Sequence, residues 1–365
     1  MADMKAFLKR KNIEFSAKRY GIDALGAMAQ GLFCSLLIGT IIRTLGQQLG
    51  VQFLTDIGSY AMAVSGPAMA VAIGYALQAP PMVLFSLAAV GWAANAEGGA
   101  GGPLAVLIIA IVAAECGKAV SKETKVDILV TPAVTILIGV ALAKWIAPPI
   151  GTAAQAFGLV IDRATKLQPF WMGIAVSVLV GVALTLPISS AAICSVLGLT
   201  GLAGGAAVAG CCAQMVGFAV MSFRENKWGG LVSQGLGTSM LQMPNIVKNP
   251  RVWIAPIVTS AITGPIATCV FGLEMNGAPI NSGMGTSGLC GPIGVVTGWF
   301  TPSERALTVG ESMGVDLAAA YANPAVQWAG LILICFVIPA VVSFLVSELM
   351  RRKGWIKDGD YKLEL

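Results

Sequence analysis

The sequence contains no histidine and few charged residues. None of its 365 residues is histidine, and Asp, Glu, Lys and Arg together make up only 11%. Without histidine, the chain cannot form a Ser-His-Asp or Cys-His catalytic set, or carry a phosphohistidine. The usual zinc and copper sites also depend on imidazole ligands. We therefore expect no catalytic residue, no metal and no cofactor in this chain.

The scarcity of charge also argues against a soluble protein. A soluble domain has about a quarter of its residues charged, whereas 56% of this chain is hydrophobic and its mean hydropathy is +0.80. Charged residues are absent from four long stretches: Ile57 to Ala96, Leu167 to Phe223, Val252 to Leu273, and Leu317 to Ser347. Because about 20 apolar residues cross a bilayer as a helix, we expect an all-α, polytopic integral membrane protein surrounded by lipid.

The apolar runs fit about ten transmembrane helices. The predicted spans are residues 24–45, 57–78, 80–96, 103–118, 128–148, 169–186, 187–202, 203–223, 252–273 and 325–349. The stretch from Gly201 to Gly205 is either a turn between two short spans or a bend within one helix. Frequent glycine (44) and proline (18) suit closely packed and interrupted membrane helices.

The basic residues define a topology and three regions. Residues 1–23 form an amphipathic N-terminal helix, residues 24–349 the membrane domain, and residues 350–365 a basic C-terminal tail. With a cytoplasmic N-terminus, the inside segments hold 18 of the 23 Lys and Arg residues, as the positive-inside rule requires. We therefore expect a protein of the cell (inner or plasma) membrane with both termini cytoplasmic. Because the basic clusters lie between apolar runs, we expect no nucleic-acid partner.

Two further segments differ in composition from the apolar spans, one being rich in glycine and the other alternating charged and apolar residues. The glycine-rich stretch from Asn95 to Pro103 is predicted to be either an outer turn or a re-entrant segment. Residues 301–323 alternate charged and apolar side chains, which predicts an amphipathic helix at an interface, capped by Thr301 or Ser303.

Two polar, glycine-rich segments interrupt the apolar pattern, one at residues 234–249 and one at residues 276–288. We call them the first and second polar segments. Irregular backbone at membrane depth survives only where protein or a watery cavity satisfies it, and transporters place substrate sites at such broken segments. The alternative is that both are surface loops.

Uncharged polar side chains crowd both segments. Amides and hydroxyls donate and accept hydrogen bonds, as recognition of a neutral polyol requires. A charged substrate would call for a buried Arg or Lys, and we expect none inside the hairpins. The competing interpretation is that these groups satisfy broken backbone or hold helices together. The candidate substrate-binding residues are Gln234, Thr238, Ser239, Gln242, Asn245, Asn249, Asn276, Asn281, Ser282, Thr286 and Ser287. We expect the two segments to approach each other near the bilayer midplane.

A family resemblance lies at the end of the first polar segment. The run Gln242-Met-Pro-Asn-Ile-Val-Lys-Asn-Pro250, followed by Arg-Val-Trp-Ile-Ala-Pro256, resembles the membrane IIC component of phosphotransferase-system sugar permeases. In that family a re-entrant hairpin commonly reads Glu-Pro-x-x-Phe-Gly-x-Pro-Ile-Val-x-Asn-Pro. The whole-chain pattern is similar to the divergent, perfringolysin-regulator-like branch. Ile246-Val247 and Asn249-Pro250 match the Ile-Val and Asn-Pro of the motif.

The resemblance implies a homodimer in which a substrate-holding domain moves against a scaffold by an elevator motion. It further implies a permease for a small polar, sugar-like solute bound at the hairpins. Separate IIA and IIB phosphocarrier proteins would supply the phosphoryl group, since residues 350–365 are too few to hold either domain. The chain itself would be at most the membrane subunit of a phosphotransferase permease.

The sequence departs from the family motif at two points. The sugar-binding glutamate of the hairpin has no counterpart, with Gln234 and Gln242 as the neighbouring polar residues, and its histidine partner is absent. A second hypothesis is therefore a membrane-bound sensor or regulator that binds a ligand without transporting it.

Overall fold

The computed structural model describes residues 2–313 and 324–363. Helices dominate it, and among these residues the only β-type pairing is one isolated antiparallel bridge, between Gly201 and Met275. The all-α fold class is therefore confirmed. The chain divides into two compact units, which we call unit 1 (residues 2–154) and unit 2 (residues 155–363).

Several helices are long and apolar enough to cross a membrane. By length and composition, six helical stretches in the described ranges qualify: Arg19–Leu49, Pro81–Val120, Asp127–Thr165, Gly201–Met221, Pro250–Val270 and Pro324–Arg352. Of these, Pro81–Val120 consists of two helices, Pro81–Gly98 and Gly102–Val120. A seventh is possible if the pair Gln52–Ala63 and Ser65–Ala76, bent by 48°, is one span. The prediction of a polytopic membrane protein is confirmed.

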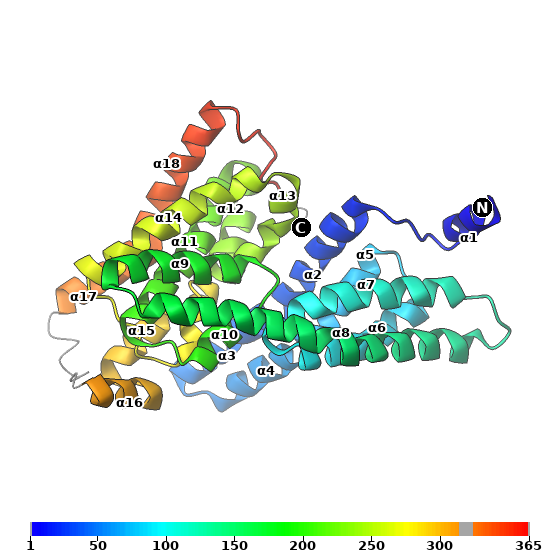
Figure 1. Ribbon diagram of the computed structural model, residues 1–365, viewed down its shortest axis with the longest axis horizontal. Coiled ribbons are helices and arrows are strands. Elements are labelled where there is room, and N and C mark those ends of the chain that lie inside the picture. The colour runs from blue at the N-terminus through cyan, green and yellow to red at the C-terminus, as the bar shows by residue number, and fades with distance from the viewer. Residues whose placement is uncertain (1, 314–323, 364–365) are drawn as a thin grey trace. The chain divides into compact units, whose positions relative to one another are not determined.

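Unit 1 consists of packed helical hairpins (Figure 1). Its elements are α1 (Ala2–Arg10), α2 (Ala24–Leu32), α3 (Ile38–Leu49), α4 (Gln52–Ala63), α5 (Ser65–Ala76), α6 (Pro81–Gly98), α7 (Gly102–Val120) and the first part of α8 (Asp127–Thr165). Helix α3 packs on α4, α5 packs on both α2 and α6, and α6 packs on α7.

The glycine-rich stretch between α6 and α7 is a turn. Helix α6 ends at Gly98, and Gly99 has φ +49°, a left-handed conformation that glycine adopts at no steric cost. The two helices then run back along each other, so that Val83 of α6 lies against Gly117 of α7. Of the two interpretations of this stretch, the turn is therefore correct.

The N-terminal segment is tied to two loops of unit 1. The Lys11 ammonium donates to the backbone oxygen of Ser121, while Nζ of Lys118 donates to the backbone oxygens of Asn12 (2.6 Å) and Leu77 (3.0 Å). Lys118 also pairs with Glu115 at 2.9 Å. These contacts gather residues 11–12, 77 and 118–121 at one side of unit 1.

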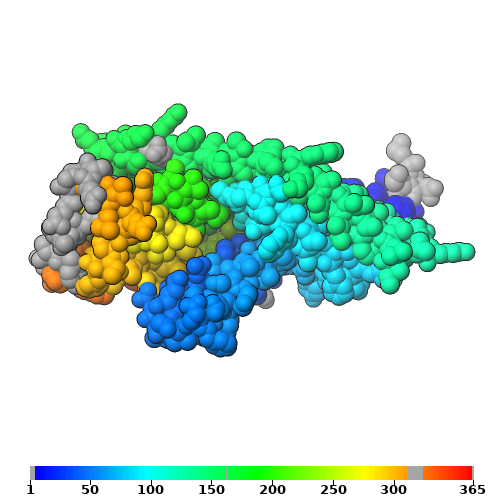
Figure 2. Space-filling view, turned by 90° about the horizontal axis from the view of Figure 1, so that it is seen from below, coloured from blue at the N-terminus to red at the C-terminus, as the bar shows by residue number. Residues whose placement is uncertain are grey.

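The hairpin of α3 and α4 presents an apolar outer face. Figure 2 shows this hairpin in blue. Leu49, Phe53 and Tyr60 are well exposed there, as expected of side chains that face lipid or another protein.

Helix α8 is longer than predicted. The sequence analysis ended this span at residue 148, but the helix continues to Thr165 with Pro132, Pro148 and Pro149 inside it. A proline removes one backbone donor and strains a helix without necessarily ending it, and such prolines are tolerated in membrane helices. The prediction of this helix end was wrong.

Unit 2 is a bundle built around α11 (Gly201–Met221). Helix α11 packs against α9 (Pro169–Thr185), α14 (Ile254–Pro265) and α18 (Ile338–Arg352), whose ribbons lie around it in Figure 1. Small residues allow the close approach. A Cβ on Gly264 of α14 would overlap the backbone oxygen of Gly173 in α9, which is the packing typical of membrane helices.

The predicted span at residues 187–202 is not a transmembrane helix. Helix α10 (Ser190–Leu197) has 8 residues, about 12 Å in length, which is too short to cross a bilayer. Ser189 caps its start, and Gly198 ends it with φ +61°. The chain then forms the bridge between Gly201 and Met275, with both N–H···O distances at 3.0 Å.

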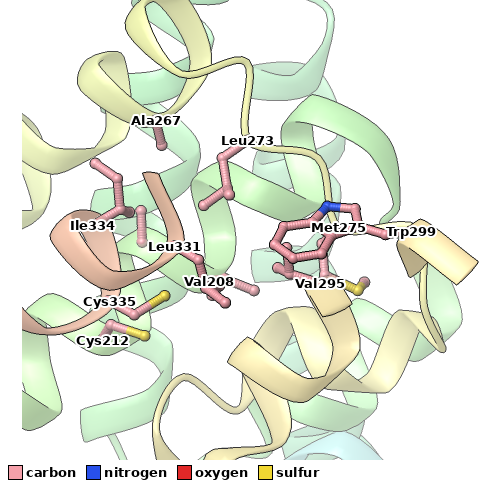
Figure 3. Close-up of a cluster of buried hydrophobic side chains, with 11 residues drawn as sticks. Val208, Cys212, Ala267, Leu273, Met275, Val295, Trp299, Leu331, Ile334 and Cys335 are labelled. Carbon is pink, nitrogen blue, oxygen red and sulfur yellow. The ribbon is translucent and has the colours of Figure 1, made fainter. Parts of the chain in front are cut away.

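A cluster of buried apolar side chains fills one end of unit 2 (Figure 3). It joins α11, α15 (Cys290–Phe300) and the segment running from α17 (Pro324–Ile332) into Leu333–Val337. Its members are Val208, Ala209, Cys212, Ala267, Leu273, Met275, Val295, Trp299, Leu331, Ile334 and Cys335. This core holds the chain on both sides of the second polar segment.

The amphipathic helix expected from residue 301 begins at Glu304 as α16 (Glu304–Met313). The Ser303 hydroxyl accepts a hydrogen bond from the Ala306 N–H at 3.3 Å, so Ser303, rather than Thr301, is the cap. Residues 314–323 of this prediction lie outside the described part of the chain.

Candidate functional site

The first polar segment is a succession of short helical turns in unit 2. It comprises the π-helical Ser233–Gly237, the 3-10 turn Ser239–Gln242 and α13 (Met243–Lys248), and the 3-10 turn Pro250–Trp253 follows it. Glycine and proline break the backbone, as the sequence predicted. Most of the segment is buried, although Leu236, Val247 and Lys248 are exposed, so it is not a simple surface loop.

The amide side chains of this segment are bonded to one another. Nε2 of Gln242 donates to Oε1 of Gln234 at 2.8 Å, and Nδ2 of Asn245 donates to Oε1 of Gln242 at 2.8 Å. Gln234 completes the row by donating to the Ser222 hydroxyl at 2.7 Å. A row in which each amide supports the next is a satisfied buried network.

The same amides also bind the end of the chain. Gln242 donates to the backbone oxygen of Tyr361 (3.1 Å), and Asn245 to that of Lys362 (2.9 Å). Asn249 donates to the Asp360 carboxylate at 2.8 Å. These three predicted ligands therefore hold the chain's own C-terminal segment.

The hydroxyls of the first polar segment also have partners. Thr238 accepts a hydrogen bond from the Met240 N–H at 3.1 Å, capping the turn that follows. The Ser239 hydroxyl lies 2.8 Å from the Thr185 hydroxyl at the end of α9. Both side chains therefore have a structural role in this conformation.

The second polar segment reaches into the middle of unit 2. It contains the 3-10 turns Pro279–Gly283 and Ser287–Leu289, and α15 follows directly. A Cβ on Gly285 would touch Cys211, and the Thr286 hydroxyl lies 3.6 Å from the Met215 sulfur. Cys211 and Met215 lie about midway along α11, so the segment enters the bundle to half its depth.

Two of the five candidate side chains in this segment, Ser282 and Asn276, form hydrogen bonds to backbone groups or to a carboxylate. Ser282 donates to the backbone oxygen of Leu199 at 2.7 Å. Asn276 donates to Glu274 at 2.8 Å and accepts from the Gly201 N–H at 3.2 Å. Asn281 is half-buried beside Gly294, and Thr286 has only the weak contact to sulfur.

Ser287 differs from the other candidates. Its side chain is 1% exposed, yet its hydroxyl has no hydrogen-bond partner in the structure. The turn Ser287–Leu289 packs against the π-helical Ser233–Gly237 of the first polar segment. The two polar segments therefore meet at the turn that contains Ser287, whose buried hydroxyl can still donate and accept a hydrogen bond.

The sequence analysis missed Gln214 of α11. Its Oε1 accepts from Nε1 of Trp253 at 2.9 Å and from the Thr185 hydroxyl at 3.2 Å, and its Nε2 donates to Ser260 at 3.4 Å. Gln214 thereby joins α9, α11, α14 and the turn Pro250–Trp253 that follows the first polar segment. A signal was present, because Gln214 and Gln168 are the only amide side chains in the charge-free run from Leu167 to Phe223.

The arrangement can bind by hydrogen bonds without proton-transfer chemistry. None of the eleven candidate residues carries an ionisable side chain. Ser287 is the candidate with an unused buried hydroxyl, and Asn281 is only half-buried. The remaining amides would have to exchange partners before they could contact a solute.

Comparison with protein-family models matched residues 22–363 to the family described as the phosphotransferase system, EIIC. Comparisons with curated proteins and with solved structures gave no match. The matched range covers both units of the chain, including the two polar segments and the C-terminal segment that binds the first of them. The chain therefore belongs to the EIIC family of the phosphotransferase system.

Proposed function

We propose that this protein is a permease that moves a small polar, sugar-like solute across the membrane by alternating access. Its family and its apolar helices make it a multi-pass protein of the plasma membrane and the membrane component of a sugar permease. The observation that supports the solute site is the junction of the two polar segments at Ser287, with its buried, unpartnered hydroxyl.

A neutral solute suits this junction best. Neither polar segment contains Arg or Lys except Lys248, whose exposed position lies in the last turn of α13. Amide and hydroxyl groups with both donors and acceptors match the alternating groups of a polyol. We infer that the solute exchanges hydrogen bonds with the amide row as it binds.

The division of the chain supports an elevator mechanism. Both polar segments lie within unit 2, so we propose unit 2 as the moving transport domain and unit 1 as the scaffold.

The apolar outer face of α3 and α4 is the surface that we propose for homodimer formation. Mass photometry in native-like lipid tests whether the protein is a homodimer, and the mass of a monomer would contradict the proposal.

Binding to the purified protein tests the proposed function. Protein in lipid nanodiscs is titrated with a panel of sugars and polyols, and at least one is expected to bind. In a Ser287→Ala variant the same solute should bind more weakly by about 1–3 kcal/mol, because one buried hydrogen bond is lost. A folded protein that binds no member of the panel, and gives no flux in proteoliposomes, would exclude this function.

Phosphoryl transfer would come from separate IIA and IIB proteins, which we propose as partners. Phosphorylated product should then form only when the phosphorylated IIA protein and the IIB protein are both added to the membrane protein and solute, so that the phosphoryl group passes from IIA through IIB to the solute. A solute that binds without flux and without product would favour the second hypothesis, a membrane-bound sensor. The absence of the family's hairpin glutamate and of histidine motivates that alternative.

A further inference from the structure

The C-terminal segment from Trp355 to Leu363 returns to the bundle after α18 ends at Arg352. Gly354 (φ +70°) and Gly359 (φ +95°) adopt left-handed conformations that allow the chain to reverse. Three apolar side chains anchor it, Ile356, Tyr361 and Leu363, of which Tyr361 is fully buried. The basic C-terminal tail that the sequence predicts therefore has a defined position in unit 2 over residues 355–363.

Amide side chains hold the segment by its main chain. Beside the bonds from Gln242 and Asn245, Nδ2 of Asn226 donates to the Tyr361 oxygen at 2.8 Å, and its Oδ1 accepts from the Leu363 N–H at 2.9 Å. Asn226 thus pairs with the segment as a neighbouring strand would. Residues 361–363 are therefore hydrogen-bonded both to the first polar segment and to α12 (Phe223–Val232).

The Tyr361 side chain fixes the register of this contact. Its hydroxyl lies 3.1 Å from the Ser347 hydroxyl and 3.9 Å from the Met221 sulfur. The Arg351 guanidinium lies 5.2 Å from the ring centre, and Arg351 also pairs with Glu225 at 2.6 Å. One buried aromatic ring therefore determines which backbone oxygens face the amides.

We propose that residues 355–363 act as a latch that restrains the first polar segment and is released when that segment moves. Every amide contact to residues 355–363 involves polar groups that water or a solute could replace. The attachment is also confined to residues 355–363, and short attachments of this kind open at lower free energy than the helices they cover. The role of this movement in admitting solute rests on the proposed function.

Hydrogen exchange on the full-length protein in nanodiscs tests the latch. In a Tyr361→Ala variant, exchange at residues 234–249 should rise about tenfold, while α9 and α14 keep their protection. Tyr361→Phe is the matched control, because it keeps the buried ring and should leave exchange nearly unchanged. Unchanged exchange at residues 234–249 in the alanine variant would overturn the latch. Loss of protection throughout unit 2 would also overturn it, because the segment would then be a permanent part of the fold.

A cross-link provides the opposite perturbation if Tyr361→Ala does not fold. Cysteines replace Asn226 and Leu363, which are hydrogen-bonded to each other, and the exposed Cys34 and Cys269 are changed to serine. The oxidised form should exchange more slowly at residues 234–249 than the reduced form, and equal rates would overturn the latch. Solute titration of both forms is read separately: failure of every solute to bind would refute the permease site and leave the exchange result standing.

Discussion

Gly210 of α11 lies directly against the backbone oxygen of Ser177 in α9, so that a Cβ on Gly210 would overlap that oxygen. The neighbour is backbone in a packed helix and cannot rotate away. We expect Gly210→Ala to lower the free energy of unfolding by about 1–3 kcal/mol, because overpacking forces the helices apart. Thermal unfolding in nanodiscs measures the change. Gly229→Ala is the control, since nothing lies within 4 Å of a Cβ there, and equal effects of the two changes would contradict the packing.

Replacing Gln214 with leucine should destabilise unit 2. The change leaves Nε1 of Trp253 and the Thr185 hydroxyl without their shared acceptor. A buried polar group left unpaired costs about 1–3 kcal/mol. Chemical denaturation of Gln214→Leu, compared with that of the exposed Gln168→Leu, measures the difference. A stability equal to that of the control would show that the network contributes nothing.

Ser287 and Ser282 should separate binding from stability. Ser287→Ala removes a hydroxyl without a partner, so we expect unchanged or slightly increased stability together with weaker solute binding. Ser282→Ala removes the bond to the Leu199 oxygen and should cost about 1 kcal/mol of stability. Thermal shift and solute titration of both variants are the measurements. If Ser287→Ala lowered the stability and Ser282→Ala did not, the roles assigned to the two serines would be wrong.

Alkaline pH should loosen the C-terminal segment. Burial raises the pKa of Tyr361 to about 12; the Ser347 hydrogen bond and the Arg351 charge oppose this, and Glu225 and Asp360 reinforce it. Because the pKa in the unfolded chain is lower, about 10, the stabilisation is complete below pH 10 and is lost as pH rises toward 12. The unfolding free energy of the wild type should therefore fall relative to Tyr361→Phe in that window. Parallel curves for the two proteins would refute this.

Both chain ends should lie in the cytoplasm. The basic residues of the N-terminal segment, the 118–127 loop and the C-terminal segment all belong to the predicted inside set. In unit 1 the N-terminal segment and the 118–127 loop contact each other, and this contact requires them to lie on the same side of the membrane. A green fluorescent protein fused after Leu365 should fluoresce, and alkaline phosphatase at the same point should be inactive. The reverse pattern would overturn the topology.

The sequence predicted the fold class and the broken segments because both depend on composition. Lack of charge identifies lipid-facing helices wherever they lie, and clustered Gly and Pro identify interrupted backbone. Helix ends within uniformly apolar sequence were harder. Nothing in the hydropathy of residues 187–202 separates α10 from a spanning helix, and the only signals were Gly198 and Gly201 at its end. At Pro148 and Pro149 the opposite error occurred. The sequence analysis ended the helix at these prolines, but α8 continues through them.

The predicted solute site stays a prediction, and the structure adds which groups its side chains contact. The two polar segments meet, as expected from their shared need for polar surroundings. The binding of Gln242 and Asn245 to the end of the chain could not be predicted, since an amide that pairs with a backbone oxygen leaves no side-chain pattern in the sequence. Their role as solute ligands stays a prediction.

The burial of α11 bears on how the protein is made. Most of its residues are buried in unit 2, and its Gly217 faces α14 and α18, which follow α11 in the chain by tens of residues. During synthesis α11 therefore enters the bilayer beside α9 alone, with its remaining grooves and the Gln214 amide facing lipid. Productive biogenesis should therefore depend on the later helices arriving before those faces find another partner.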